Sequence, residues 1–332
     1  MRVFVTHNPE DLDAYFGRAL PALASVAEVV TNPLDRDLTT AELIGHARGC
    51  DVIVAHRSTP GEAPVFAELP GLLAFLRTAV DISTIDVQAA TEHGVLVAHA
   101  DKSFVASTAE IALALMLDLA RNVSESTIEY RNGIEPQQRP GFQLRGRVAG
   151  LIGYGAIGRY LADLLRALGL TVLVTEPYHA DAAADGFEQT TLDDLLERSD
   201  FVLPLAPATS ETEHLIDADA IARMRPGTML VNVSRGELLD ESAVGEALDT
   251  GQLGGLAMDV GCAPDQRPTP ELAHRPGVVA TPHLGGLTPE NADAQAHSAV
   301  EQVVAMLRGE IPPRAVNADQ ARRLRAWWSN SG

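Results

Sequence analysis

Lysine and cysteine are scarce in this chain of 332 residues. Lys102 is the only lysine among 25 basic residues, which indicates either an arginine-rich genome or a place where an ammonium group is needed. The genomic explanation is the simpler of the two. The two cysteines, Cys50 and Cys262, are too few for a disulfide framework or a zinc site. We therefore expect no structural metal.

Long apolar runs are also absent. No stretch reaches the length of about 18 apolar residues that a membrane-spanning helix needs. The first five residues look like a strand rather than a signal peptide. With 45 acidic residues the net charge is −20, and the field of such a chain repels phosphate. These features argue against nucleic-acid and membrane partners, and they predict a cytoplasmic protein that acts on a small molecule.

Short apolar runs alternate with helical stretches along the whole chain. The alternation predicts parallel sheets with helices on their faces, and the length predicts two domains. The expected strands are 3–5, 26–30, 52–54, 72–76, 95–97, 148–152, 170–174, 201–203, 229–233, 256–258 and 278–280. The expected helices are 12–20, 40–48, 105–121 (closing the first domain), 289–307 (returning to it) and a tail fragment at 322–328, with a polar arm over 122–146.

A glycine-rich segment carries the first functional signal. Residues 153–158 read Gly-Tyr-Gly-Ala-Ile-Gly, after the apolar run 148–152 and before a helical pattern that ends at Gly169. Such glycines permit a tight turn, close approach of backbone N–H groups to a pyrophosphate, and tight packing of helix on strand. The segment predicts a dinucleotide site. Its expected contacts are Gly153, Tyr154, Gly155, Ala156, Ile157 and Gly158.

A carboxylate follows at the spacing that such a site requires. Glu176 comes after the next strand, eighteen positions beyond Gly158, where it would bind the ribose hydroxyls. Its charge would repel the 2′-phosphate of NADP, and residues 177–179 offer no arginine to bind one. NAD is therefore the predicted cofactor. A glycine-rich turn without a ligand is the alternative, which the placed acid disfavours.

Polar residues end several later strands. Arg235 follows the run 229–233, where a guanidinium can bind a carboxylate and a carbonyl oxygen together. His283 lies in a proline and glycine turn; a packing role is its common alternative, and Asp265 is the acid available to orient it. With a nicotinamide cofactor these residues predict hydride transfer coupled to proton transfer. Arg57, after the strand 52–54, lies where open α/β sheets bind ligands.

Several segments together resemble the D-isomer-specific 2-hydroxyacid dehydrogenases. Besides 153–158 they are PLAPAT at 204–209, VNVSRGELLDE at 231–241, GQLGGLAMDV at 251–260 and TPHLGG at 281–286. The resemblance implies two doubly wound parallel-sheet domains with the active site between them, and dimers formed through the cofactor domain. We expect a Rossmann NAD-binding domain at 120–288 and a discontinuous flavodoxin-like substrate-binding (catalytic) domain at 1–119 and 289–332.

The resemblance also implies roles for single residues. It implies that Arg235 and His283 are catalytic and that Asp259 binds the carboxamide group of the nicotinamide. Where the family has a catalytic glutamate, the ungapped position here is Pro264, and we assign the role to Asp265 by allowing one extra residue. Further cofactor contacts expected from its motifs are Pro207, Thr209 and Val233.

The segment that receives the substrate departs from the family pattern. A Gly-x-Gly loop is replaced by Ala79, Val80 and Asp81, and His99 and Lys102 stand for an asparagine and a glycine. We hypothesise that Asp81 and Lys102 form a pair that selects a substrate bulkier or more polar than lactate. The expected substrate contacts are Arg57, Ala79, Val80, Asp81, His99 and Lys102.

The predicted function is that of an NAD-dependent oxidoreductase that interconverts a D-2-hydroxy acid and its 2-keto acid, as a homodimer. Phosphorylated and phosphonate acids are among the candidate substrates, with Arg57 and Lys102 as anion contacts. A dinucleotide-sensing binding protein, like the corepressor branch of the same fold family, is the alternative. Arg235 and His283 favour the enzyme, whereas the missing glutamate keeps the alternative open.

Overall fold

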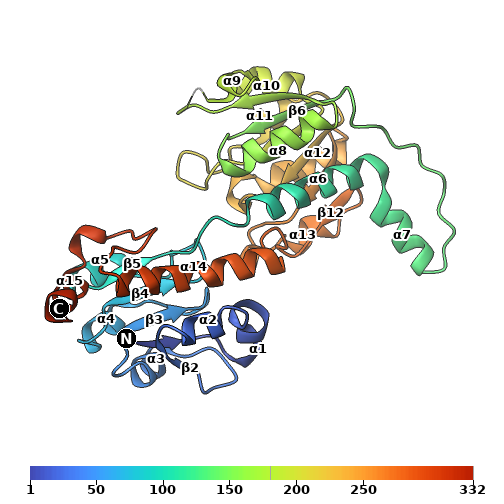
Figure 1. Cartoon of the computed structure of the whole chain (residues 1–332). Coiled ribbons are helices and arrows are strands. Elements are labelled where there is room, and N and C mark those ends of the chain that lie inside the picture. The colour runs from blue at the N-terminus through green and yellow to red at the C-terminus, as the bar shows by residue number, and fades with distance from the viewer. Residues whose placement is uncertain (180, 332) are drawn as a thin grey trace. The chain divides into compact units, whose positions relative to one another are not determined.

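The computed structural model describes residues 1–179 and 181–331 (Figure 1). Its contacts divide the chain into two compact units. Unit 1 comprises Met1–Ser103 and the chain from Pro289 onward, and unit 2 comprises Phe104–Thr288. Each unit is built on its own parallel sheet, as the alternation of apolar runs predicts. The chain therefore leaves unit 1 once and returns to it once.

Unit 1 contains a five-stranded parallel sheet with the order β2-β1-β3-β4-β5. This order is that of flavodoxin-like folds, as expected. Every residue of the inner strands β3 and β4 is buried, because helices cover both faces of the sheet. The strands are β1 (Arg2–Val5), β2 (Glu28–Thr31), β3 (Val52–Ala55), β4 (Ala74–Arg77) and β5 (Leu96–Ala98).

The two faces of this sheet bury different sets of helices. Alternation along β1 sends Val3 and Val5 to one face and Phe4 to the other. The first face packs against η1 (Leu12–Phe16), α2 (Leu20–Ala24), α14 (Pro289–Leu307) and α15 (Arg322–Ser331). The second packs against α3 (Thr40–His46), α4 (Ala63–Glu68) and α5 (Val87–Glu92). Unit 1 therefore needs both ends of the chain for one of its two cores.

The helix expected over 12–20 is wrong in detail. The segment forms a short helix α1 (Pro9–Asp11), the π-helical turn η1 and, after a break at 17–19, the helix α2. The N–H of Gly17 donates to the Leu12 carbonyl, which closes the wide turn. Pro21 lacks an N–H, so the second helix cannot continue the first. The helix at 289–307 is confirmed as α14.

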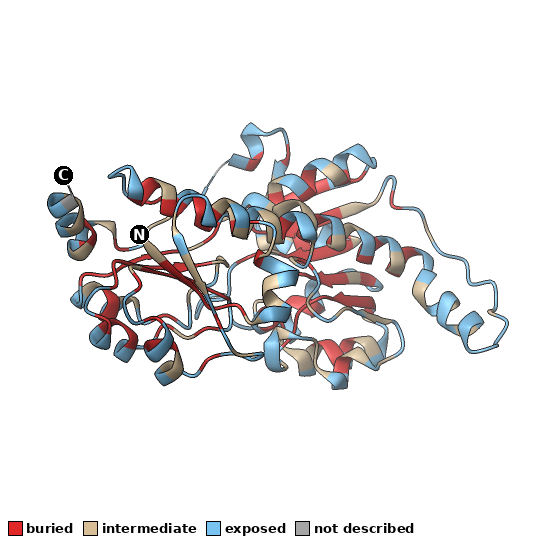
Figure 2. Ribbon diagram, turned by 60° about the horizontal axis from the view of Figure 1, so that its bottom comes forward, coloured by how far each residue is buried: buried red, intermediate tan, exposed pale blue. Residues whose placement is uncertain are grey.

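Unit 2 contains a seven-stranded parallel sheet with the order β12-β11-β10-β9-β6-β7-β8. Figure 2 shows its inner strands buried. All six expected strands are present, and the two-residue edge strand β8 is the one that sequence reasoning missed. The strands are β6 (Val148–Ile152), β7 (Thr171–Thr175), β8 (Glu188–Gln189), β9 (Phe201–Pro204), β10 (Thr228–Asn232), β11 (Leu253–Met258) and β12 (Val278–Ala280).

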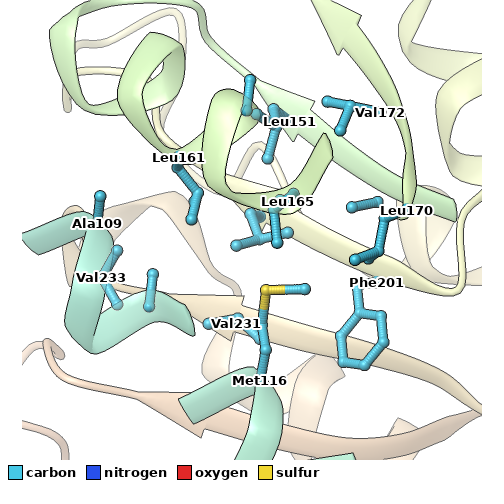
Figure 3. Close-up of a cluster of buried hydrophobic side chains, with 14 of the residues drawn as sticks. Ala109, Met116, Leu151, Leu161, Leu165, Leu170, Val172, Phe201, Val231 and Val233 are labelled. Carbon is cyan, nitrogen blue, oxygen red and sulfur yellow. The ribbon is translucent and has the colours of Figure 1, made fainter. Parts of the chain in front are cut away.

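Helix α6 (Val105–Arg121) belongs to unit 2 and does not close unit 1 as expected. Its Ala109 and Met116 pack with Leu161 and Leu165 of α8 (Ala156–Ala167) over the sheet residue Val231 (Figure 3). The expected boundary after residue 119 would cut this helix near its end. The contacts place the boundary before the helix, because its apolar face is buried in the core of unit 2.

The arm expected to be irregular over 122–146 contains the helix α7 (Val123–Arg131). Asn122, with φ 53°, lies between α6 and α7 and turns the chain. No residue of α7 is buried, and Figures 1 and 2 show the arm extending away from the sheet of unit 2. The helix is missed by sequence reasoning because it has no apolar stripe that a core would require.

The remaining elements complete the two units. The tail docks on its own chain, because Trp328 donates its indole N–H to the Met306 carbonyl at 2.7 Å. The described part of the chain has no helix of the length and apolarity that a membrane crossing demands, and a cytoplasmic location stays a prediction. The other helices are α9 (Asp181–Ala184), α10 (Leu192–Arg198), α11 (Ala218–Arg223), η2 (Gly236–Leu238), α12 (Glu241–Thr250), η3 (Pro264–Gln266), α13 (Pro270–Ala273) and η4 (Ala318–Gln320).

Candidate active site

The candidate residues of unit 2 lie at one edge of its sheet. Each follows the carboxyl end of a strand, and parallel strands bring these ends to the same edge. Strand β6 lies between β7 and β9: the chain adds β7 and β8 on one side of β6 and then crosses to add β9 on the other side. Open α/β sheets bind ligands at such a switch point. The glycine-rich loop after β6 occupies it.

Two glycines of this loop have no room for a side chain. Gly153 has φ 108°, and a Cβ there would lie 2.9 Å from the Leu205 carbonyl carbon. A Cβ on Gly158 would lie 2.7 Å from the Gly153 carbonyl oxygen, so only glycine lets α8 start this close to the strand. Gly155 caps α8 without a side-chain hydrogen bond, and Gly155 and Ala156 are exposed. The first N–H groups of α8 are therefore presented to a phosphate.

Glu176 is held at the end of the neighbouring strand by two backbone donors. Its Oε2 accepts from the Tyr154 N–H at 3.0 Å, and its Oε1 accepts from the Tyr178 N–H at 3.1 Å. The carboxylate is thereby fixed beside the glycine-rich loop, with lone pairs left for the hydroxyls of a ribose. The nearby Arg159 is ion-paired with Asp181 and Asp185. These donors and acceptors fit a dinucleotide.

Three of the predicted cofactor residues contribute their side chains to the core. Tyr154 is 3% exposed, packs against Phe187 and donates its hydroxyl to Asp185 at 3.0 Å. Burial is the main cause that raises the pKa of the Tyr154 phenol to about 12. Val233 is buried, and Ile157 packs on the same cluster. Any contact of Tyr154 and Val233 with a cofactor is left to their backbone groups.

Pro207 and Thr209 lie in an exposed loop after β9 that a single hydroxyl ties together. Thr212 Oγ1 accepts from the Thr209 N–H at 2.8 Å and donates to the Pro207 carbonyl at 2.6 Å. The loop follows the strand next to β6, so it lies beside the glycine-rich loop. Contact of Pro207 and Thr209 with the cofactor stays a prediction.

Arg235 follows β10 in a loop that Asn232 shapes from within. The Asn232 amide donates to the Arg235 carbonyl at 2.8 Å and accepts from the Ser234 N–H at 3.1 Å. Arg235 is half-buried, and its Nη1 donates to the Ser234 carbonyl at 2.7 Å. One end of the guanidinium is thereby oriented by the chain. Its remaining N–H groups suit a bidentate acceptor such as a carboxylate.

His283 is held in the left-handed region, with φ 60°, in the turn after β12. Its Nδ1 lies 3.1 Å from the Asp265 carbonyl oxygen. A carbonyl oxygen only accepts hydrogen bonds, so this contact places the proton of the neutral imidazole on Nδ1. The lone pair is then on Nε2, which suits proton exchange with a hydroxyl group.

The predicted pairing of His283 with the Asp265 carboxylate is not the contact that the structure shows. The backbone carbonyl of Asp265 makes it, and the Asp265 carboxylate lies 3.7 Å from Arg267 Nη2. Asp265 is exposed and has φ 62°, within the short turn η3. A backbone acceptor orients the imidazole without adding a second charge. The role of Asp265 as third catalytic residue stays a prediction.

Asp259 fixes the histidine turn, a role that sequence reasoning missed. It is 1% exposed and lies just past β11. Its Oδ1 accepts from the Thr281 hydroxyl at 2.6 Å and from the Leu284 N–H at 2.7 Å, and its Oδ2 accepts from the Gly285 N–H at 2.7 Å. A buried carboxylate therefore binds both sides of His283. Its position at a strand end, followed by an apolar segment, was the available signal.

In unit 1 the predicted substrate residues also follow strand ends. Arg57 is exposed in the loop after β3, and Ala79, Val80 and Asp81 follow β4. The last residue of β4, Arg77, is fully buried. Its guanidinium donates to the His56 carbonyl, to the Thr59 carbonyl at 2.8 Å and to the Thr84 hydroxyl at 2.9 Å.

Arg77 is a second residue that sequence reasoning missed. Burial lowers the pKa of its guanidinium to about 10, and the charge of Asp81 opposes this shift. The side chain ties the loop that carries Arg57 to the loop that contains Thr84. Its signal was weak, because Arg77 follows the expected strand 72–76 and no motif singles it out.

The hypothesised pair of Asp81 and Lys102 is absent from the described residues. Asp81 Oδ1 accepts from the Ser83 N–H at 2.8 Å. Lys102 is exposed, and its ammonium has no ion pair within the described chain. His99 is half-buried, with Nδ1 2.8 Å from the Ala100 carbonyl. Selection of a substrate by such a pair is not supported by this geometry.

Two further histidines, His7 and His56, follow β1 and β3 and are buried. Their ring centroids lie 4.9 Å apart. Burial lowers the pKa of His7 well below its usual value, and the charges of His56 and Arg77 add to the effect. Burial also lowers the pKa of His56, while Asp11 and Asp37 oppose the shift. Burial therefore favours the neutral form of both imidazoles.

Sequence and structure comparisons connect this geometry to known proteins. The sequence model of the D-isomer specific 2-hydroxyacid dehydrogenase NAD-binding domain matches residues 113–285. The chain belongs to that family. A D-3-phosphoglycerate dehydrogenase of Mycobacterium leprae is 37% identical over 84% of this chain and 53% of its own length. A glyoxylate reductase of Korarchaeum cryptofilum is 33% identical over 83% of this chain and 86% of its own length.

Solved structures share the fold. A crystal structure from Thermus thermophilus is 31% identical, with a TM-score of 0.83 over 95% of this chain and all of that one. The chain spans about half the length of the phosphoglycerate dehydrogenases that it matches. The matched NAD-binding domain lies within unit 2 and includes the glycine-rich loop, Glu176, Arg235 and His283. NAD is the cofactor of this dehydrogenase domain.

Proposed function

We propose that this dehydrogenase interconverts a D-2-hydroxy acid and its 2-keto acid with NAD. The observation that carries the proposal is the His283 turn. The Asp265 carbonyl binds Nδ1 of the imidazole, and Asp259 holds the residues on both sides of it. A histidine that only packed would not need its tautomer and its turn fixed so closely. Family membership supports the same reaction.

In this proposal the chain supplies the general acid and base, His283, and the cation that stabilises the reacting oxygen, Arg235. When bound, NAD accepts or supplies the hydride. His283 takes the hydroxyl proton on Nε2 during oxidation and returns it during reduction. Arg235 donates hydrogen bonds to the reacting oxygen and to the substrate carboxylate, and so stabilises the charge that develops on the oxygen. Glu176 and the N-terminus of α8 hold the adenosine and pyrophosphate parts of NAD.

Unit 1 is proposed as the substrate-binding domain. Arg57 offers a cation at the edge of its sheet, which suits the carboxylate or phosphate of a substrate. Lys102 offers an exposed ammonium in the same unit. The relatives act on different acids by their names, phosphoglycerate and glyoxylate. A short 2-keto acid with a second anionic group is the substrate class that two separate cations favour.

The proposal is tested by NADH oxidation with a panel of 2-keto acids, with and without a phosphate group. Turnover of at least one acid, lost in His283→Ala while NADH still binds, is the expected result. General acid–base catalysis accounts for about 10²- to 10⁴-fold of rate, and the variant should lose that much. Tight NADH binding without turnover of any acid would instead support the dinucleotide-sensing alternative.

We also propose that the chain forms homodimers through unit 2. Helix α7 has no buried residue, yet it exposes Val123, Ile128 and Tyr130. The following arm exposes Ile134 and is anchored on the helix by Arg139, which pairs with Glu129 at 2.7 Å. An ordered arm with exposed apolar side chains suits contact with a second copy. Light scattering should give twice the chain mass, and a monomer at micromolar concentration would contradict the proposal.

A further inference from the structure

Three side chains of metal-ligating type converge at the carboxyl edge of the unit 1 sheet. They are Asp11, Asp37 and His56, and their candidate ligand atoms all lie within 4.8 Å of one another. Each comes from a different segment: helix α1, the loop between β2 and α3, and the end of β3. The cluster is separate from the residues proposed above for catalysis, all of which belong to unit 2.

Two of the three ligands are held in place by the fold. Asn8 caps α1 and its amide donates to Asp11 Oδ2 at 2.8 Å, which orients the carboxylate. His56 Nδ1 lies 3.6 Å from that same oxygen and 2.9 Å from the Ser58 hydroxyl. The His56 side chain is 11% exposed. It lies between the rings of His7 and Tyr15, with centroids 4.9 Å and 5.7 Å away.

The third candidate ligand, Asp37, lies at the surface. Asp37 is exposed, next to the buried Leu38 that anchors its loop. Its carboxylate oxygen lies within 4.8 Å of the candidate ligand atoms of Asp11 and His56. An ion has access from this side.

We propose that Asp11, Asp37 and His56 bind one divalent transition-metal ion of the zinc or cobalt type. Bonds of about 2.0–2.2 Å in a tetrahedral site separate the ligand atoms by about 3.4 Å. The distance of 3.6 Å between Asp11 Oδ2 and His56 Nδ1 is close to that value. The exposed Asp37 carboxylate needs only a small side-chain movement to reach the same ion. Two carboxylates and a neutral imidazole balance the charge of the ion. Calcium and magnesium are disfavoured, because they prefer oxygen ligands throughout.

Three protein ligands leave a fourth position, for water or for the Ser58 hydroxyl beside His56. The ion would fasten the segments after β1 and β2 to the loop after β3. That loop also carries Arg57. Control of the substrate loop by the ion rests on the function proposed above, whereas binding of the ion does not.

The test uses the full chain, treated with a chelator and then titrated with Co²⁺ as the probe. Wild-type protein is compared with Asp37→Asn, whose exposed side chain leaves the fold undisturbed. Asp35→Asn is the matched control, because Asp35 is an exposed carboxylate in the same loop outside the cluster. Visible absorption and calorimetry report binding, and a competition with Mg²⁺ reports the ligand chemistry.

We expect one Co²⁺ per chain at this site, with visible absorption bands of low-coordinate cobalt. Asp37→Asn should weaken the binding about 10- to 100-fold, while Asp35→Asn binds like wild type. Equal binding by the two variants, or absence of stoichiometric binding in wild type, would overturn the proposal. Displacement by equimolar Mg²⁺ would also overturn it, because an imidazole ligand selects against magnesium. These outcomes are independent of turnover, so they are distinct from failure of the proposed enzyme function.

Discussion

The two sheet edges of this molecule organise their polar groups in opposite ways. At the edge of unit 2, backbone N–H and carbonyl groups orient the ionisable side chains: Glu176 by two amides, His283 by a carbonyl, Asp259 by two amides and a hydroxyl. At the edge of unit 1, a buried guanidinium binds the loops themselves. Unit 2 uses its backbone to place side chains, whereas unit 1 uses a side chain to place its backbone.

This difference has a physical consequence. The ionisable side chains of unit 2 have backbone partners, so their placement does not depend on a second charged side chain. A buried cation with carbonyl and hydroxyl acceptors is stable only while all of those acceptors stay in position. Substitution of Asp259 or Arg77, which hold other residues in place, should therefore lower stability and activity together, whereas substitution of Glu176 should act on cofactor binding.

The largest effect is expected for Asp259→Ala. The change removes a buried carboxylate that accepts three hydrogen bonds, so the free energy of unfolding should fall by about 3 kcal/mol or more. Turnover should fall as well, because the His283 turn loses its anchor. Urea unfolding and NADH oxidation measure the two effects. The exposed Asp265→Ala variant should stay within about 0.5 kcal/mol of wild type, and equal losses in both variants would contradict the assigned role.

Arg77→Met should give the next largest change, about 2 kcal/mol in the free energy of unfolding, because buried acceptors lose their donor. The KM for the keto acid should rise, since the loop that carries Arg57 is no longer tied to its neighbours. Arg57→Met is the comparison. It should raise KM and leave the urea midpoint in place. An Arg77→Met protein with the KM of wild type would show that the loops after β3 and β4 keep their conformation without the Arg77 hydrogen bonds.

Glu176→Ser should weaken NADH binding about tenfold, equivalent to about 1.4 kcal/mol, because a charged acceptor for the ribose hydroxyls is lost. Binding of NADPH should weaken less or improve, since the repulsion of its phosphate is relieved. Fluorescence titration with both cofactors measures this. Glu188→Ser, an exposed glutamate on β8, is the control. If Glu176→Ser kept the wild-type preference for NADH over NADPH, residues other than Glu176 would be responsible for that preference.

Tyr154→Phe should have the smallest effect, about 0.5–1 kcal/mol, through the lost hydrogen bond to Asp185. The pKa of the phenol is about 12 in the folded chain, above its ordinary value of 10. The folded state therefore keeps the proton that the unfolded state releases, and stability falls as pH rises from 10 to 12. The variant should show a weaker fall over that range in thermal unfolding. The same loss of thermal stability between pH 10 and 12 in wild type and Tyr154→Phe would contradict this prediction.

Much of unit 2 is predictable from its sequence because the signals there are local. The glycines at 153–158, the acid at Glu176 and the polar residues after each strand all depend on neighbours along the chain. The bounds of β6 and α6 are predicted to the residue.

The remainder depends on contacts that the sequence does not record. Assignment of α6 to unit 2 is decided by the surface against which it packs. The partner of His283 is a carbonyl of Asp265, and backbone atoms leave no mark in the sequence. The acceptors of Arg77 come from two loops, and the proposed metal cluster joins three segments. Polar contacts between residues far apart in the chain are visible in a structure, but the spacing of residues along the sequence does not predict them.

The division of unit 1 between the two ends of the chain has a consequence for synthesis. Val3 and Phe16 leave the ribosome before unit 2, whereas Val303 and Leu324, which share a core with them, leave after it. The whole of unit 2 is made in between and can fold first. One core of unit 1 can therefore be completed only after unit 2 has been made. Until α14 emerges, the nascent chain carries an uncovered apolar sheet face, and this is the stage at which a chaperone would be needed most.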